Sequence, residues 1–317
     1  MVNPRLSVLL SAYNAENYIT EAIESILNQE FRDFELLIAD DGSDDNTRLV
    51  IDSYSYDSRV RILHNEKNEG KTITINRLFV LSRGTYVTIH DADDISLELR
   101  FQKQLDLLYS DPELVMCGCS FVSFTGHGFE SKGLMEADYA VLQKEILKES
   151  QFHGPTMIFK KEVIINELNG ELFRPFFQDY NEDCDLAIRL SEVGVCSNLR
   201  DVLYRYRILP NSLSKTLTAR KKSLYPFLVE LHKQRLHFGK DYLQKGEIDQ
   251  AELMLESIIN KHYQDSSKIY RESAEFLMYY QFRGEAVRQA WQAVVNFPSK
   301  WVNWGTLQYC VRKYLFG

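Results

Sequence analysis

Cysteines are few in this sequence, and their positions argue against a disulfide framework or a cysteine-based zinc site. The five are Cys117, Cys119, Cys184, Cys196 and Cys310, an odd number without paired zinc-type spacing. Such scatter is typical of reduced, mostly buried thiols in a cytoplasmic protein. Long apolar runs are also missing, because no segment approaches the roughly 20 apolar residues that span a bilayer. The first residues lead directly into a strand-like run, without the apolar core of a signal peptide.

Basic residues and glycine-rich loops are also in short supply. The 37 lysines and arginines are outnumbered by 45 aspartates and glutamates, which gives a formal net charge of −8. This balance argues against a nucleic-acid partner, which requires a basic surface. No Gly-x-Gly-x-x-Gly or Walker-type loop occurs, so neither a dinucleotide Rossmann site nor a P-loop is expected. A bound phosphate would depend on a metal ion and on basic side chains such as Lys71 or Arg77, although most such side chains are simply solvent-exposed.

The fold class follows from the pattern of apolar residues, which make up 44% of the chain. Strand-like runs and helical periodicities alternate four times in residues 1–110. The expected strands span residues 6–11, 34–39, 60–64 and 86–90, and a helix follows each. Asn14 is the expected N-cap of the first helix. Such alternation predicts an α/β fold with a mostly parallel sheet flanked by helices.

Polar residues gather where three of these strands end. They are Ser11-Ala12-Tyr13, Asp40-Asp41 and Asp91-Ala92-Asp93-Asp94. Ligands of open α/β sheets bind beyond the carboxyl ends of the strands, so these residues should converge on one site. Crowded carboxylates repel one another unless a cation neutralises them, and hard oxygen ligands suit Mg²⁺ or Mn²⁺. The alternative for the Asp-rich segment is a solvated turn.

The second half of the chain is less regular. We expect a strand at 114–124, a turn-rich loop at 126–133 and a helix at 137–149, followed by aromatic residues at 173–180. Asp183 would then lie in the first turn of another helix. An acid there is stabilised by the helix dipole, so Asp183 could be an ordinary capping residue. The alternative role is that of a general base at the mouth of a site, although position alone favours capping.

Seven short motifs together resemble the family 2 glycosyltransferases, which have the GT-A fold. In chain order they are Ser11-Ala12-Tyr13-Asn14, Asp40-Asp41-Gly42-Ser43-Asp44-Asp45-Asn46-Thr47, Asn68-Glu69-Gly70 with Asn76, Asp91-Ala92-Asp93, Glu182-Asp183-Cys184-Asp185-Leu186 with Arg189-Leu190, Tyr204-Arg205-Tyr206-Arg207 and Ser212-Leu213-Ser214. The resemblance covers about residues 5–215. One departure is Ile75, where many members have Arg, so Lys71 or Arg77 would have to supply the positive charge.

The resemblance implies an inverting enzyme that moves a sugar from a nucleoside-diphosphate sugar, with UDP-sugars favoured by family frequency. The acceptor would be a hydroxyl of a saccharide or lipid-linked glycan, in cell-surface polysaccharide synthesis. Donor contacts would come from Ala12, Tyr13, Glu16, Asp41, Asn68, Lys71, Asp91 and Ala92. Asp93, together with Asp91, would bind Mn²⁺ or Mg²⁺, and Asp183 would be the general base. His153 and Glu182 would lie on the acceptor side, although His153 could equally be structural.

The resemblance also divides the chain into a GT-A domain at 1–215, with a donor half to about 110 and an acceptor half at 111–215, and a helical region at 216–317. The last 20 residues contain apolar and aromatic residues with Lys300, Arg312 and Lys313 and no acid. Such a helix could either dock on the body or lie at a membrane interface. We therefore expect a cytoplasmic protein that could be peripheral on the inner face of the membrane.

Two other functions fit parts of the pattern. A sugar-phosphate nucleotidyltransferase shares the carboxylates and the α/β sheet, but it would need a glycine-rich basic loop after the first strand, which is absent at 11–16. A non-catalytic carbohydrate-binding or scaffold protein could use the same fold. Such a protein would be a transferase that has lost its activity, and the presence of Asp91, Asp93 and Asp183 argues against that loss.

Overall fold

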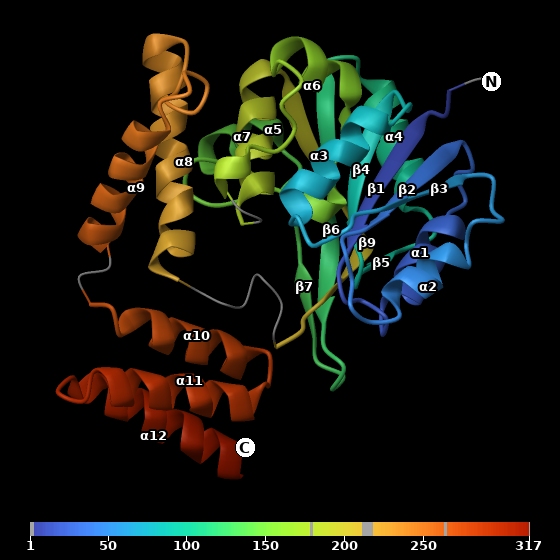
Figure 1. Cartoon of the computed structure of the whole chain (residues 1–317). Coiled ribbons are helices and arrows are strands. Elements are labelled where there is room, and N and C mark those ends of the chain that lie inside the picture. The colour runs from blue at the N-terminus through green and yellow to red at the C-terminus, as the bar shows by residue number, and fades with distance from the viewer. Residues whose placement is uncertain (1–2, 178–179, 211–217, 263–264, 317) are drawn as a thin grey trace. The chain divides into compact units, whose positions relative to one another are not determined.

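The computed structural model describes residues 3–177, 180–210, 218–262 and 265–316. The chain forms two compact units, whose elements are labelled in Figure 1. Unit 1 comprises Met1–Phe124 and Glu130–Arg207, and unit 2 comprises Thr125–Phe129 and Ile208–Gly317. The predicted boundary between residues 215 and 216 and the motif Ser212-Leu213-Ser214 lie outside the described residues.

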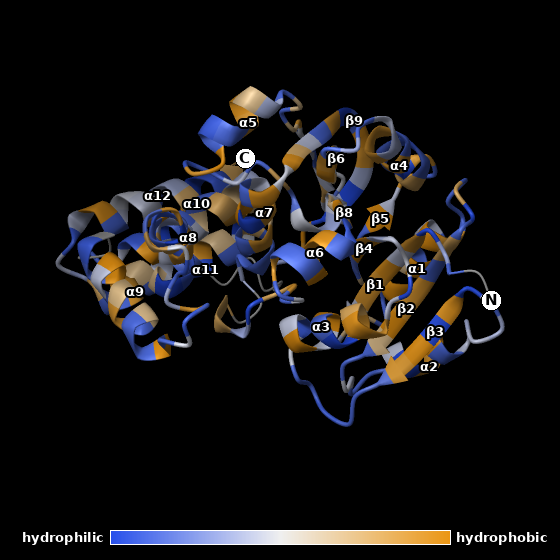
Figure 2. Cartoon of the chain, turned by 90° about the horizontal axis from the view of Figure 1, so that it is seen from above, coloured by the Kyte–Doolittle hydropathy of each residue, from blue (hydrophilic) through white to orange (hydrophobic). Residues whose placement is uncertain are grey.

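Four parallel strands form the first half of the sheet, in the order β3-β2-β1-β4. They are β1 (Leu6–Ala12), β2 (Phe34–Asp40), β3 (Val60–His64) and β4 (Tyr86–Asp91). β1 and β2 are almost wholly buried, which explains why their residues are apolar on both faces (Figure 2). In the register of the sheet, Ala12 pairs with Asp40 and Ser11 pairs with Asp91. The polar strand ends therefore meet at one edge, as the sequence predicts.

Helices cover both faces of this parallel half. They are α1 (Ile19–Leu27), α2 (Thr47–Asp52), α3 (Lys71–Leu81) and α4 (Arg100–Ser110). The apolar faces of α1 and α4 pack with Leu6, Val8 and Leu10 in one core cluster. α3 contacts β1 and β2 but contributes nothing to that cluster, so it covers the opposite face.

The loop between β1 and α1 differs from the sequence prediction. The N-cap of α1 is Tyr18 rather than Asn14. Asn14 has a φ of 48°, a left-handed conformation that asparagine tolerates better than most residues. Its side-chain oxygen accepts a hydrogen bond from the backbone N–H of Asp44, and its own N–H donates to the Ser43 hydroxyl. Asn14 therefore holds the β1–α1 loop against the loop after β2, instead of capping the helix.

The second half of the sheet is mixed, and its order continues as β4-β8-β6-β9-β5, with β7 beside β6. These strands are β5 (Ile95–Ser96), β6 (Leu114–Phe124), β7 (Glu130–Gly133), β8 (Ile158–Lys160) and β9 (Val195–Arg207). β6 and β9 are parallel, whereas the pairs β4–β8, β6–β8, β5–β9 and β6–β7 are antiparallel. The prediction of a loop over the whole of 126–133 is wrong, because β7 extends the sheet there.

Short helices connect these strands. They are α5 (Tyr139–Glu145), the 3₁₀ helix η1 (Gly154–Thr156), α6 (Lys161–Glu167), the 3₁₀ helix η2 (Pro175–Phe177) and α7 (Glu182–Val193). α5 is shorter than the helix predicted at 137–149. Asp138 sets where it starts, because its side chain caps the helix by accepting from the N–H groups of Ala140 and Val141. α7 begins directly after Asn181, so Asp183 lies in its first turn as predicted.

Unit 2 is helical apart from its connecting segments. Its helices are α8 (Ala219–Phe238), α9 (Ile248–His262), α10 (Lys268–Tyr279), α11 (Arg283–Asn296) and α12 (Trp301–Phe316). α12 packs on α11 through a buried face, where Asn303 donates to the carbonyls of Ala293 and Phe297. Among the described residues, no helix has both the length and the apolar character needed to cross a bilayer.

Candidate active site

The acidic segment after β4 is the first part of the site. β4 ends at Asp91, and Asp93 and Asp94 follow in a turn, so the chain bends between the carboxylates of Asp91 and Asp93. The Asp91 carboxylate forms an ion pair with Lys71 Nζ at 2.7 Å. Burial alone would raise the pKa of Asp91, but the ammonium of Lys71 outweighs burial and lowers that pKa. Asp91 is therefore an ionised carboxylate.

The pKa values of Asp93 and Asp94 are raised, in contrast to that of Asp91. Burial and the negative charge of Asp91 raise the pKa of Asp93 to about 6. Asp94 is fully buried, and burial together with the charges of Asp93 and Asp91 raises its pKa well above the usual value. Asp94 Oδ1 accepts a hydrogen bond of 2.7 Å from the backbone N–H of Arg207, whereas Oδ2 has no hydrogen-bond partner within the described ranges. Crowded, desolvated carboxylates of this kind are stabilised by a cation.

The donor set fits a divalent ion that is held jointly by protein and substrate. In the part of the chain that the structure describes, no three His, Cys, Asp or Glu side chains converge to form a complete metal site. Magnesium is commonly bound by one or two carboxylates together with substrate phosphates and water, rather than by an all-protein cage. Asp93 and Asp91 meet that requirement, because they are two carboxylates in a turn at the open end of β4.

Two side chains hold the backbone of this acidic turn. The pKa of His90 falls to about 3 because it is buried and near the positive charge of Arg100, so its ring is neutral. Its Nδ1 lies 2.8 Å from the Asp91 carbonyl and donates to it. Arg207 Nε donates to the Asp93 carbonyl at 2.7 Å. The sequence motif containing Arg207 carried no specific role, and no local signal links it to Asp93, which lies more than a hundred residues earlier.

Arg207 also ties the acidic turn to neighbouring elements. Its guanidinium pairs with Glu21 of α1 and lies over the rings of Tyr18 and Phe124, 5.0 and 4.5 Å from their centroids. The acidic turn, the start of α1 and the end of β6 therefore share one cationic anchor.

Asp41 is the centre of a second, buried network beside the donor edge. Its carboxylate accepts hydrogen bonds from the Asn65 amide at 2.7 Å, the Thr74 hydroxyl at 2.9 Å, and the backbone N–H groups of Glu69 and Gly70 at 3.0 Å. These bonds fix the loop that leads into α3. Asn65 was not singled out from the sequence. Asn65 contacts Asp41 and Thr74 only because β2, β3 and α3 converge here, so its role could not be predicted from the sequence.

The remaining residues predicted to contact the donor lie around this edge. Tyr13 is 44% exposed just beyond β1, while Ala12 ends that strand and accepts from the Asp41 N–H. Glu16 accepts from both the backbone and the side-chain amide of Asn46. Asn68 accepts from the Gly70 N–H, which braces the turn before α3. Arg77 is engaged elsewhere, because its guanidinium pairs with Glu69 and bonds Asn65.

Lys71 connects the donor edge with α7. Its Nζ lies 2.7 Å from Asp91 and 3.8 Å from Glu182. Burial would lower the pKa of Lys71, but the charges of Asp91 and Glu182 outweigh burial and raise that pKa. Lys71 is therefore a cation at every physiological pH, held between the acidic turn and the first turn of α7.

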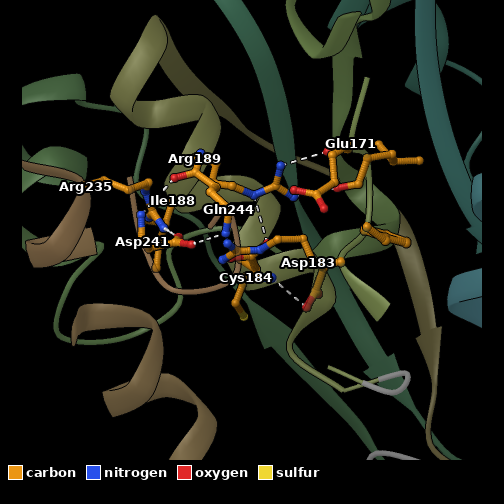
Figure 3. Close-up of polar contacts among 12 residues, drawn as sticks. Glu171, Asp183, Cys184, Ile188, Arg189, Arg235, Asp241 and Gln244 are labelled. Atoms are coloured by element: carbon orange, nitrogen blue, oxygen red, sulfur yellow. Dashed lines mark hydrogen bonds and ion pairs between the residues drawn. The ribbon is translucent and has the colours of Figure 1, made fainter. Parts of the chain in front are cut away.

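Asp183 has a defined orientation in that first turn (Figure 3). Its Oδ1 accepts from the Cys184 N–H at 2.8 Å, and its Oδ2 accepts from the Gly154 N–H at 3.2 Å. The acidic first turn of α7 thus places one carboxylate against Lys71 and the next against η1. This geometry leaves Asp183 both a helix-terminal acid and a candidate base.

A buried ion network supports the start of α7. Asp185 accepts from Arg174 and Arg189, and all three side chains are at most 2% exposed. Arg189 also donates to the carbonyls of Glu171 and Leu172 (Figure 3). The sequence placed Asp185 in a family motif but did not identify Arg174 as its partner, because that contact depends on how the segment before α7 folds back.

His153, the residue directly before η1, lies in an aromatic cluster. Its ring stacks on Phe121 at 4.1 Å and meets Tyr206 edge-on at 4.6 Å. Its carbonyl accepts from both the N–H and the hydroxyl of Thr156. These contacts give His153 a structural role in positioning η1, and a contact with the acceptor stays a prediction.

The sequence matches the family model "Glycosyl transferase family 2" over residues 7–170, more than half of the chain. A Bacillus subtilis glycosyltransferase named for teichuronic acid biosynthesis, TuaG, is 27% identical over 239 residues, covering 75% of this chain and 91% of the relative. The O-antigen biosynthesis glycosyltransferase WbnJ of Escherichia coli is 29% identical over 223 residues, covering 68% of this chain and 84% of the relative.

Solved structures share the fold. S. aureus TarS in complex with UDP-GlcNAc superposes with a TM-score of 0.62 at 19% identity, covering 92% of this chain and 81% of the TarS chain. The mannosyltransferase PcManGT from Pyrobaculum calidifontis, in complex with GDP-Man and Mn²⁺, gives a TM-score of 0.55 at 17% identity, covering 99% and 87%. The family match favours a glycosyltransferase over the nucleotidyltransferase and the non-catalytic binding protein. The chain belongs to glycosyl transferase family 2 and is a glycosyltransferase with a GT-A-like fold.

Proposed function

We propose that this glycosyltransferase moves a sugar, with inversion, from a nucleoside-diphosphate sugar to a hydroxyl of a saccharide or lipid-linked glycan. The observation that carries the proposal is the arrangement of carboxylates on two sides of Lys71, with Asp91 and Asp93 on one side and the first turn of α7 on the other. A UDP-sugar is the favoured donor, since TarS was solved with UDP-GlcNAc. Relatives named for teichuronic acid and O-antigen biosynthesis support a role in cell-surface polysaccharide synthesis.

On the donor side, Asp93 and Asp91 would hold Mn²⁺ or Mg²⁺. The raised pKa of Asp93 supports this role, because burial and the charge of Asp91 outweigh the opposing charges of Lys71 and Arg207, and a bound cation would relieve that repulsion. PcManGT, which shares the fold, was solved with GDP-Man and Mn²⁺. Bound there, the ion would act as a Lewis acid on the diphosphate. The Lys71 ammonium would add positive charge to the same leaving group.

The nucleoside would lie along the edge formed by the loops after β1, β2 and β3. Tyr13 is exposed there for a contact with the base, with Ala12 and Ala92 forming the adjoining backbone. Asp41, Asn68 and Glu16 would shape these loops through the hydrogen bonds they accept. A carboxylate that already accepts four hydrogen bonds is suited to holding the loop that contacts the nucleoside.

The acceptor hydroxyl would approach Asp183. Its proton passes to the Asp183 carboxylate as its oxygen attacks the anomeric carbon from the face opposite the diphosphate. The bond from the anomeric carbon to the diphosphate oxygen breaks, and the electron pair leaves with the nucleoside diphosphate. A single displacement with one base inverts the anomeric configuration, and such a base typically contributes ~10²–10⁴ in rate. Glu182 and His153 would border the acceptor.

The test uses a panel of nucleotide sugars with Mn²⁺ and water as the acceptor. We expect slow release of one nucleoside diphosphate, faster with Mn²⁺ than with a chelator. Proton NMR of the sugar released from an α-linked donor should first show the β anomer. Initial release of the α anomer would contradict inversion, and equal rates in the chelator would contradict the metal site.

We also propose that α12 contacts an anionic membrane surface. One face of α12 packs on α11, and side chains elsewhere on the helix remain exposed. The exposed apolar residues are Trp301, Val302, Trp304, Tyr309, Tyr314, Leu315 and Phe316. Arg312 and Lys313 supply positive charge in a chain of net charge −8, whereas Lys300 pairs with Asp265 at 3.1 Å. Aromatic side chains beside cations are typical of helices at the membrane interface.

Vesicle flotation tests the membrane proposal. The full chain should float with vesicles that contain phosphatidylglycerol but not with phosphatidylcholine alone. Trp301→Ala with Trp304→Ala should reduce flotation, whereas Trp291→Ala on α11 should not. Equal flotation of both variants would contradict a membrane contact through α12.

A further inference from the structure

Gly154 lies against the carboxylate of Asp183 more closely than any other residue type could. A Cβ built on Gly154 would lie 2.4 Å from Asp183 Oδ2, 2.7 Å from its Cβ and 2.9 Å from its Cγ. The Gly154 N–H donates to the same Oδ2 at 3.2 Å. The missing side chain therefore lets the backbone both approach the carboxylate and hydrogen-bond it. The φ of Gly154 is not in the left-handed region, so close approach rather than backbone conformation requires glycine here.

The η1 turn that carries Gly154 is fixed to the body of unit 1. Arg100, fully buried on α4, donates from one nitrogen to the Pro155 carbonyl and to the Thr88 hydroxyl of β4, both at 2.7 Å. Gln104, one turn later on α4, donates to the Thr156 carbonyl at 2.8 Å. The Thr156 hydroxyl closes the turn by donating to the His153 carbonyl at 2.7 Å. Gly154 is thus part of a rigid segment, which links Asp183 to the same strand that ends at Asp91.

We propose that Gly154 is a positioning residue that sets the place and direction of the Asp183 carboxylate for catalysis. The inference rests on the proposed role of Asp183 as the general base. With the Gly154 N–H on Oδ2 and the Cys184 N–H on Oδ1, the carboxylate cannot rotate without losing a hydrogen bond. Each oxygen keeps a lone pair that is not used by these two bonds and could accept the proton of an incoming hydroxyl.

Gly154→Ala tests the inference. Ordinary contact begins near 3.4 Å, so a methyl group at 2.4 Å from Oδ2 must move the carboxylate by about 1 Å. A misplacement of that size costs about 100-fold in rate. We expect kcat to fall by about 100-fold while the dissociation constant for the donor, measured calorimetrically, stays within about twofold, because positioning is lost and donor binding is not. Gly126→Ala is the matched control, since a Cβ there meets nothing within 4 Å.

A double-mutant cycle separates positioning from general damage. If Gly154 acts through Asp183, Gly154→Ala should cost nothing further in an Asp183→Asn background, in which residual release of nucleoside diphosphate is measured. An undiminished loss in that background would overturn the inference. So would full activity of Gly154→Ala when Asp183→Asn is inactive. Full activity of Asp183→Asn would instead overturn the proposed base.

A milder variant keeps the test valid if Gly154→Ala does not fold. Thr156→Val removes the hydroxyl that closes η1 but leaves Gly154 and Asp183 unchanged. We expect a smaller loss of kcat, about tenfold, again without a change in donor affinity. Melting temperatures measured alongside identify any variant that is merely unstable. A fall in donor affinity equal to the fall in kcat for Thr156→Val would contradict the inference.

Discussion

The buried ion network around Asp185 makes a quantitative prediction about stability. Its carboxylate accepts from Arg174 Nε at 2.9 Å and from Arg189 Nε at 2.8 Å, and none of the three side chains is more than 2% exposed. Asp185→Asn keeps the shape of the side chain but removes its charge. Two buried guanidinium groups then lose their shared counter-ion. Removing one partner of a buried ion pair costs about 3–5 kcal/mol.

Chemical denaturation followed by far-ultraviolet circular dichroism measures this cost. We expect the free energy of unfolding to fall by about 3–5 kcal/mol and the melting temperature by about 6–20 °C. Trp291, Trp301 and Trp304 all lie in unit 2, so their fluorescence reports that unit separately.

Glu130→Gln is the control for this stability measurement, because Glu130 forms an exposed pair with Arg205 at 2.8 Å. Exposed pairs contribute less than about 1 kcal/mol. A loss for Asp185→Asn no larger than that of the control would refute the reasoning. Unit 1 would then tolerate two buried guanidinium groups without their common carboxylate.

Other predictions concern the donor edge. Because the pKa of Asp93 is raised to about 6, the apparent affinity for Mn²⁺ should fall as the pH drops below about 6. A calorimetric Mn²⁺ affinity that stays constant from about pH 5 to 8 would contradict this prediction. Without the ion, the folded state holds this proton more tightly than the unfolded chain, so stability should fall as pH rises from 3.8 to about 6. Arg207→Ala removes the bond to the Asp93 carbonyl and should weaken metal-dependent donor binding about tenfold, unlike Arg205→Ala, and unchanged affinity would count against that role. Lys71→Met removes the cation 2.7 Å from Asp91 and should raise the dissociation constant of the donor by at least about tenfold. An unchanged dissociation constant would show that Lys71 does not contact the donor.

Local patterns predicted the parallel half of the fold well. The strand at 60–64 and the helix after each parallel strand were predicted from the alternation of strand-like runs and helical patterns, as was the meeting of the polar strand ends. The mixed half was harder, because β5 and β7 are short and are stabilised by pairing with β9 and β6 rather than by their own composition. Asn14 shows the same limit. Helix capping is predicted from neighbouring residues, but the Asn14 side chain instead accepts a hydrogen bond from Asp44, 30 residues away.

The site shows which functional information is local. Carboxylates such as Asp91 and Asp93 can be recognised in the sequence because they are crowded at the end of a strand. The residues that orient them do not, because Arg207 reaches Asp93 only after β9 has paired beside β5 and β6. Gly154 likewise has no distinguishing sequence signal until α7 brings Asp183 against it.

The most direct test of the central claim compares turnover and donor binding in Asp183→Asn. Asparagine preserves the size of the side chain but cannot accept the acceptor's proton. We expect release of nucleoside diphosphate to fall by at least about 100-fold, with donor affinity by calorimetry unchanged. Turnover equal to that of the unaltered enzyme would show that Asp183 is not the base.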